Sequence, residues 1–214
     1  MFWVTLLLSS LLSLGGASAP DGPVVLAYGD SLTAGLGIAE EDAWPALPQA
    51  RAAQSFPGLK VVNAGVSGDT SAGGLRRLNW SLRRPVDVVI LALGANDGLR
   101  GIDPDTTRAN LQAIIDGIRA KYPDAALILA GMTLPPNLGR DYIGRFEAVF
   151  TDLAETNNLP LIPFLLAGVA GDPALNQADG IHPTEAGHRI VADTVWPFLQ
   201  RALAESSEKA RPSP

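Results

Sequence analysis

Five short apolar segments alternate with longer segments of helical periodicity, and this alternation constrains the fold more than any other feature of the chain. The apolar segments have the length and β-branched content of buried strands. They cover residues 24–29, 60–64, 86–93, 125–130 and 159–164, and each ends near Gly, Asn or Pro. The alternation predicts an α/β fold, a three-layer α/β/α sandwich around a five-stranded, mainly parallel sheet.

Three of the intervening segments carry apolar residues at the i, i+3, i+4 spacing of an amphipathic helix. The first opens with Asp103-Pro104, because proline is favoured at the first helical position, and it continues to Tyr122. The second covers residues 142–153. The third covers residues 184–199, where Pro197 is expected to kink or shorten the helix. We interpret these apolar stripes as core-facing sides of helices, not as cofactor sites.

The first 20 residues contain no charged side chain and have the pattern of a secretory signal segment. The apolar stretch ends near Leu14, short of the roughly 20 residues that a membrane-spanning helix needs, and Ala17-Ser18-Ala19 fits a cleavage site. No Lys or Arg precedes this stretch, so an uncleaved anchor is the alternative. We expect a signal peptide over residues 1–19 with cleavage near Ala19, and a periplasmic or secreted product without stable membrane insertion.

Composition excludes several classes of site. The chain has no cysteine, so thiol nucleophiles, disulfides and zinc–thiolate sites are excluded. The net charge is −6, and the arginines at positions 76, 77, 83 and 84 are interpreted as a solvated helix face, so no nucleic-acid partner is expected. With 47% hydrophobic residues, the chain suits a single domain with a sizeable core, which we expect over residues 20–204. Residues 205–214 are polar and contain proline, so a disordered tail is expected there. We expect a monomer.

The segment Gly29-Asp30-Ser31 follows the first apolar segment and presents a candidate nucleophile. We expect Gly29 to supply backbone angles that a residue with a Cβ would resist. If a helix begins near Leu32, the amide of Ser31 would point at a group that approaches its hydroxyl. The alternative is a strand-to-helix turn in which the serine serves only as an N-cap.

A serine hydroxyl is a weak nucleophile unless an adjacent base takes its proton, and the chain contains two histidines. His182 lies in a predicted loop three residues after Asp179, whose carboxylate would fix the tautomer of the imidazole. His188 lies inside the predicted helix over residues 184–199, where a structural or surface role is favoured. The alternative for Asp179 and His182 is a turn with an incidental histidine.

Acyl transfer also needs hydrogen-bond donors for the oxyanion. Three candidates follow predicted strands and should lie at the same edge of the sheet: the Ser31 amide, the Gly65 amide and the Asn96 side chain. Ordinary turn chemistry is the alternative role for Gly65 and Asn96. Leu99, Leu134 and Pro135 lie in the neighbouring loops and are predicted to form an apolar wall for an acyl chain.

Four blocks of sequence now carry a family resemblance: GDSLTAG with Ser31, NAGVSGDTS with Gly65, GANDGLRG with Asn96, and DGIHP with Asp179 and His182. In order and spacing they resemble the GDSL or SGNH hydrolases, and most closely the periplasmic branch of multifunctional thioesterases, proteases and lysophospholipases. The resemblance implies a flavodoxin-like SGNH hydrolase fold, a Ser-His-Asp triad, an oxyanion hole from the three donors above, and a mobile loop after Asn96 that covers acyl chains. One departure is Gly-Ala-Asn-Asp, where that branch often has two glycines.

Together, the residues and the resemblance predict a serine hydrolase of carboxylic esters and thioesters, of the arylesterase, acyl-CoA thioesterase or lysophospholipase type. The acyl-enzyme would form on Ser31, the substrate would be a small-molecule acyl ester or thioester, and neither a metal nor a cofactor is expected. Two alternatives stay open. A secreted acyltransferase would use the same triad, and a non-catalytic binding module would share only the fold.

Overall fold

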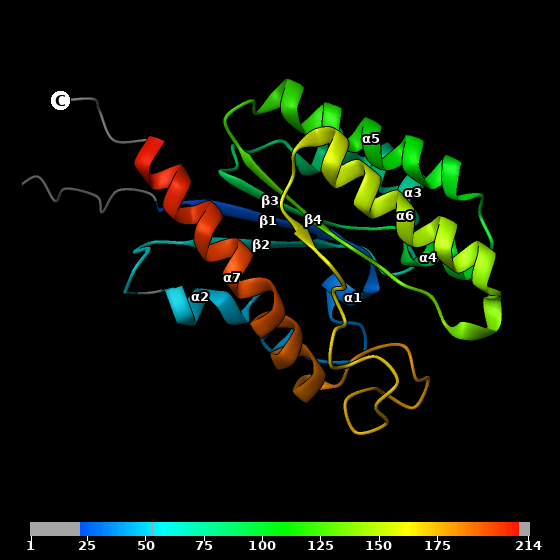
Figure 1. The fold of residues 1–214 in the computed structure, drawn as a ribbon. Coiled ribbons are helices and arrows are strands. Elements are labelled where there is room, and N and C mark those ends of the chain that lie inside the picture. Colours follow the sequence, from blue (N-terminus) through cyan, green and yellow to red (C-terminus); the bar gives the residue numbers. More distant parts are fainter. Residues whose placement is uncertain (1–21, 53, 210–214) are drawn as a thin grey trace, which may run out of the picture.

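The computed structural model describes residues 22–52 and 54–209, whose strands form a parallel sheet in the order β2-β1-β3-β4-β5 (Figure 1). The strands are β1 (Val24–Gly29), β2 (Lys60–Gly65), β3 (Val88–Ala92), β4 (Ala126–Ala130) and β5 (Leu161–Ile162). The chain leaves β1 toward one edge for β2 and returns to the other side for β3, so the direction of winding reverses between β1 and β3. Ligands of such sheets bind outside the carboxyl ends of the strands at this reversal.

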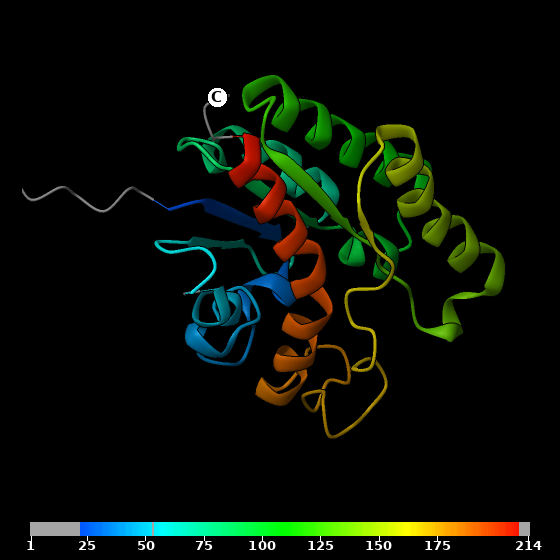
Figure 2. The ribbon, with the colours of Figure 1, turned by 60° about the vertical axis from the view of Figure 1, so that its left-hand side comes forward.

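Helices cover both faces of the sheet (Figures 1 and 2). One layer contains α3 (Ser71–Ser81), α5 (Pro104–Lys121) and α6 (Arg140–Asn157), and α5 contacts both of its neighbours. The other layer contains α2 (Leu47–Ala52) and α7 (Glu185–Lys209), which contact each other. Four short elements join these layers: α1 (Ser31–Ala34), η1 (Glu40–Asp42), α4 (Ala95–Leu99) and η2 (Pro136–Leu138). The predicted three-layer α/β/α architecture with a parallel sheet is confirmed.

The last strand is shorter than the sequence predicts. Residues 159–164 were expected to be extended, but β5 pairs with β4 only at Leu161 and Ile162. Pro160 and Pro163 flank this pair. Pro160 has no amide hydrogen to donate to β4, so the pairing does not extend before Leu161. After Ile162 the Leu165 amide donates to the Gly131 carbonyl (3.0 Å), which the next residue of a regular ladder, Phe164, would have used, and the pairing ends there.

The last helix is longer than the sequence predicts, because α7 continues through Pro197 to Lys209. Pro197 removes the bond from its nitrogen to the Asp193 carbonyl, but both residues are exposed, so water can replace that partner. The prediction of a disordered tail from residue 205 is therefore wrong for residues 205–209. Ala202 and Leu203 are buried, and the Ser207 hydroxyl donates to the Leu203 carbonyl (2.8 Å), which holds this end of the helix.

The predicted signal peptide over residues 1–19 and residues 210–214 of the predicted tail lie outside the described residues. Within the described ranges, no helix is long and apolar enough to cross a membrane.

Candidate active site

The turn after β1 presents Ser31 at the carboxyl end of the sheet. Asp30 caps α1, and its side chain accepts a hydrogen bond from the Leu32 amide (3.0 Å). Gly29 is required for space rather than for its backbone angles: its φ is not positive, but a Cβ there would lie 2.0 Å from Thr33 Oγ1 and 2.8 Å from the Ala92 carbonyl. The predicted strand–turn–helix is confirmed, while the reason for the glycine differs from the one expected.

His182 and Asp179 lie in line with Ser31. The Ser31 Oγ is 2.9 Å from His182 Nε2, and His182 Nδ1 is 2.6 Å from Asp179 Oδ2. The other oxygen of Asp179 accepts hydrogen bonds from the amides of Ile181 (2.9 Å) and His182 (3.0 Å). These three hydrogen bonds to Asp179, chiefly those from His182, lower the pKa of its carboxyl to about 2. Asp179 therefore stays ionised at neutral pH and favours the tautomer in which His182 Nε2 is free to accept a proton.

The loop that carries Asp179 and His182 is tied to the nucleophile turn. The Gln177 amide donates to the His182 carbonyl (2.7 Å), and the Gly180 amide donates to the Gln177 carbonyl (2.9 Å). The Gln177 side chain donates to the carbonyls of Leu36 (2.7 Å) and Pro183 (2.9 Å). Gln177 thus fixes the histidine loop against the segment that follows α1.

Asn96 lies in the first turn of α4 just after β3, on the other side of the reversal from Ser31. Its amide nitrogen Nδ2 donates to the Asp69 carbonyl (3.0 Å) and lies 3.3 Å from Asp30 Oδ2. The structure therefore places the predicted oxyanion donor against the residue that precedes the nucleophile. Within the described chain, no acceptor is found for the Ser31 amide, so this donor is free to bind an oxyanion.

Gly65 ends β2 beside β1, where it pairs with Gly29. A Cβ at this position would lie 2.2 Å from the Ala34 nitrogen in α1. The glycine is thus needed so that α1 can pack against β2. In this structure the Gly65 amide donates to Asn63 Oδ1 (3.0 Å), so an oxyanion at Gly65 would have to share or replace that bond.

Two buried carboxyl groups of the site were missed by the analysis of the sequence. Asp30 is fully buried, and this burial raises the pKa of its carboxyl to about 6, although hydrogen bonds from Leu32 and Asn96 oppose the shift. Asp97, also fully buried, accepts hydrogen bonds from the amide (2.7 Å) and hydroxyl (2.5 Å) of Ser71. Asp97 thereby anchors the helix that carries Asn96. The available signal was a carboxylate directly adjacent to each predicted functional residue.

An apolar cavity of about 330 Å³ opens beside the nucleophile turn. Leu32, which directly follows Ser31, lines it, so the cavity adjoins the candidate nucleophile. The three predicted wall residues Leu99, Leu134 and Pro135 all line it as well. Residues that the sequence analysis missed complete the wall, among them Met132, Phe164, Leu166 and Ile181.

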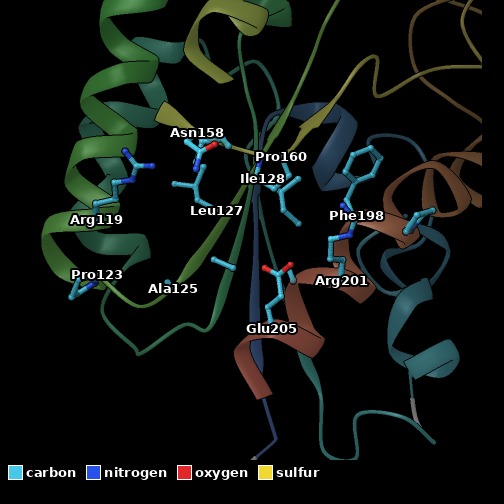
Figure 3. A pocket seen from close by; sticks show the side chains of 14 residues that line it. Arg119, Pro123, Ala125, Leu127, Ile128, Asn158, Pro160, Phe198, Arg201 and Glu205 are labelled. Carbon is cyan, nitrogen blue, oxygen red and sulfur yellow. The ribbon is translucent and has the colours of Figure 1, made fainter. Parts of the chain in front are cut away.

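A larger cavity of about 660 Å³ lies between α5 and α7, beside the amino-terminal part of β4 (Figure 3). Arg119, Leu127, Phe198 and Arg201 are among its lining residues. None of them belongs to the segments that carry Ser31, Asn96 or His182. Its position away from the carboxyl ends of the strands makes it a poor candidate for the acyl site despite its size.

His188 has a structural role, as the sequence favours. It is 1% exposed, and its Nδ1 accepts a hydrogen bond from the Trp44 amide (3.1 Å). Burial, and secondarily the nearby His182, lowers the pKa of His188 to about 4. The imidazole is therefore neutral in the folded protein near neutral pH.

This burial predicts a loss of stability in acid. An unfolded histidine takes up a proton near pH 6.5, whereas folded His188 does so near pH 4, so the unfolded state binds more protons between these values. The free energy of unfolding should consequently fall, by on the order of 2–3 kcal/mol from this residue, as the pH drops from 7 to 4. Urea unfolding over this range, compared with His188→Gln, measures it. Equal pH slopes for the two proteins would contradict the prediction.

Among residues 22–52 and 54–209, no group of three or more histidine, aspartate or glutamate side chains is gathered so that it could hold a metal ion. The groups at the site are instead a hydroxyl, an imidazole, a carboxylate and amide donors beside an apolar cavity. This set can perform nucleophilic acyl transfer through an oxyanion intermediate.

Comparisons with known proteins point to the same chemistry. The sequence model of the GDSL-like Lipase/Acylhydrolase family matches residues 27–190. The chain is 42% identical over 181 residues to Esterase TesA of Pseudomonas aeruginosa, covering 84% of this chain and 89% of that protein. It is 38% identical over 192 residues to Thioesterase 1/protease 1/lysophospholipase L1 of Escherichia coli K12, covering 89% of each. The structure of the psychrotrophic esterase EstA from Pseudoalteromonas sp., inhibited by monoethylphosphonate, matches with a TM-score of 0.78 at 33% identity, over 85% of this chain and 98% of that one.

Proposed function

Because this chain belongs to the GDSL-like Lipase/Acylhydrolase family and is a serine hydrolase of carboxylic esters and thioesters, we propose that Ser31, His182 and Asp179 form its catalytic triad. The observation that carries the proposal is the continuous line of contacts from Ser31 Oγ to His182 Nε2 (2.9 Å) and from His182 Nδ1 to Asp179 Oδ2 (2.6 Å). No metal or cofactor takes part in the proposed reaction.

The reaction proceeds in two acyl transfers. In the first, His182 Nε2 takes the proton of the Ser31 hydroxyl as Oγ attacks the acyl carbonyl, and the tetrahedral intermediate collapses when the leaving alcohol or thiol receives that proton. In the second, water loses a proton to His182 and attacks the acyl-enzyme. The resulting tetrahedral intermediate collapses to release the acid, and His182 returns the proton to Ser31. Asp179 remains a carboxylate throughout and stabilises the imidazolium form of His182.

The oxyanion of each intermediate would be held by the Ser31 amide, the Gly65 amide and Asn96 Nδ2. Asn96→Ala should therefore lower kcat by about 10²–10³-fold, the usual cost of losing one such donor, and by a similar factor for oxygen esters and thioesters. KM should change much less, because the donor acts chiefly in the transition state. Steady-state kinetics on matched ester and thioester substrates measure both values. Asn79→Ala, at an exposed position of α3, is the control. A normal kcat for Asn96→Ala would exclude this donor.

The acyl chain of the substrate would lie in the apolar cavity beside Leu32, with Leu99, Leu134 and Pro135 in its wall. A series of esters with one leaving group and increasing acyl length tests this function. Each methylene buried in the cavity contributes up to about 0.8 kcal/mol, so kcat/KM should rise by up to about fourfold per methylene until the cavity is filled. A flat profile would argue against an acyl group in this cavity.

We also propose that the enzyme acts as a monomer in the periplasm or outside the cell, after removal of a signal peptide. The proposed export rests on the uncharged, apolar first 20 residues and on Ala17-Ser18-Ala19, which fits a cleavage site. The mature chain should therefore begin at Pro20. Mass spectrometry of the protein from its native cells measures the N-terminus, and an intact Met1 in the membrane fraction would favour an uncleaved anchor instead.

A further inference from the structure

The sequence predicts that Arg77 lies on a solvated helix face. In the structure it instead links two segments of the active site. Its Nε donates to Asp69 Oδ2 (2.5 Å), and its Nη2 donates to the Gly29 carbonyl (2.8 Å). The side chains of Arg77 and Asp69 are only 19% and 17% exposed, and the guanidinium lies over the ring of Tyr28, 4.2 Å from its centroid. A partly buried guanidinium with two fixed acceptors and an aromatic face beneath it is held in one orientation.

A third acceptor of Arg77, Ser81 Oγ (3.3 Å from Nη1), lies in α3 itself, whereas the other two lead to the reacting groups. Gly29 is two residues before Ser31, and its carbonyl also accepts a hydrogen bond from the Val66 amide (3.0 Å). Asp69 presents its own backbone carbonyl to Asn96 Nδ2 at 3.0 Å. Arg77 thus connects the end of β1, which carries the nucleophile, with the peptide that holds the oxyanion donor.

The first turn of α3 is shaped around this contact. A Cβ on Gly73 would lie 2.4 Å from Asp69 Oδ1, so glycine leaves the room that the carboxylate needs. The Gly73 amide is instead bonded to Thr70 Oγ1 (3.2 Å), which caps the helix. The Asp69 carboxylate is therefore available to Arg77 rather than being used as a helix cap.

We propose that Arg77 and Asp69 form a positioning pair that fixes the Asn96 amide relative to Ser31. The inference rests on the proposed function, because it assigns the pair a role only through the oxyanion donor. An asparagine side chain can rotate, and its Nδ2 keeps its position through the acceptors around it. Because a donor displaced by about 1 Å can cost about 10²-fold in rate, a pair that holds the Asp69 carbonyl in place contributes to kcat without touching the substrate.

A general brace of the fold would use the same contacts, so the test must separate the two roles. We expect Arg77→Met to lower kcat by about 10–100-fold and to change KM by less than about threefold, because the acyl cavity is lined by other segments. Arg77→Lys keeps the charge but not the fork of donors, so its kcat should lie between those of the wild type and Arg77→Met. Arg76→Met, at an exposed position next to Arg77 on α3, is the matched control and should have the wild-type kcat.

The deciding measurement repeats Arg77→Met in the background of Asn96→Ala. If Arg77 acts through Asn96, the loss of kcat should shrink to less than about threefold once the donor is gone, because the two substitutions remove one interaction. Asp69→Asn, which keeps the backbone carbonyl but removes the carboxylate charge, should behave in the same way. Thermal unfolding of each variant ensures that kinetics are compared on folded protein.

Two results would overturn the inference while leaving the proposed function intact. One is a normal kcat for Arg77→Met alongside an impaired Asn96→Ala variant. The other is an equal loss from Arg77→Met with and without the Asn96 side chain, which would make Arg77 a brace of the fold. A normal kcat for Asn96→Ala itself would remove the assigned donor, and the positioning role would fall with it.

Discussion

Ser31→Ala should abolish nearly all turnover of esters and thioesters, with kcat reduced by about 10⁴–10⁶-fold while the protein stays folded. The methyl group of alanine fits where the serine Cβ lies, and Ser31 Oγ makes its contact with His182 rather than with the core. The loss should therefore come from the missing nucleophile and not from unfolding. The residual rate would reflect substrate binding and the oxyanion donors, which the substitution leaves in place.

The same substitution tests whether Ser31 is the covalent nucleophile. A fluorophosphonate probe should label the wild-type protein once, at Ser31, because its phosphorus accepts the activated oxygen as an acyl carbon would. Ser31→Ala should not be labelled. Ser67→Ala is the matched control, because Ser67 is an exposed serine in the loop after β2. It should keep both labelling and turnover. Labelling at another serine, or normal turnover in Ser31→Ala, would exclude the assignment.

The residues of the proposed triad could be predicted from the sequence because their chemistry restricts the choices. The chain has two histidines, and the one with a carboxylate three residues before it is the one that reaches Ser31. The placement of Ser31 and Asn96 at one edge followed from the parallel sheet, since both residues come just after strands. Local periodicity likewise predicted α5 and α6, whose apolar stripes face the core.

What the sequence did not predict depends on contacts between distant segments. Arg77 reaches a carbonyl 48 residues away, and Asn96 meets a carboxylate 66 residues away. A local sequence pattern cannot predict contacts between residues that are so far apart in the sequence. Atoms of α1 and β3 fill the space beside Gly29, so this glycine is required for space rather than for the backbone angles that the sequence suggested. The helix α7 passes Pro197 because the lost hydrogen bond faces water, which periodicity alone does not show.

His182→Ala should be nearly as damaging as Ser31→Ala, with kcat reduced by about 10⁴–10⁶-fold, because the serine then has no base. The two variants differ in one respect. The substitution leaves a space at the surface, since the His182 side chain is 17% exposed, and added imidazole can occupy it. Imidazole should therefore restore part of the activity of His182→Ala and none of that of Ser31→Ala. His188→Gln should keep a normal kcat near neutral pH, and the reverse ranking of the two histidines would show that the wrong base was assigned.

The pH dependence of kcat/KM follows from the same assignment. The base must be neutral to accept the serine proton, so kcat/KM should fall in acid. Asp179 does not contribute to this loss, because its hydrogen bonds from His182 and Ile181 lower its pKa to about 2 and it stays ionised over the range. Asp30 is the remaining candidate, since burial raises its pKa to about 6. The variant Asp30→Asn separates the contributions of His182 and Asp30, because its side chain cannot titrate. If kcat/KM of this variant still falls at low pH, the loss is assigned to His182. If the loss disappears, it is assigned to Asp30 instead.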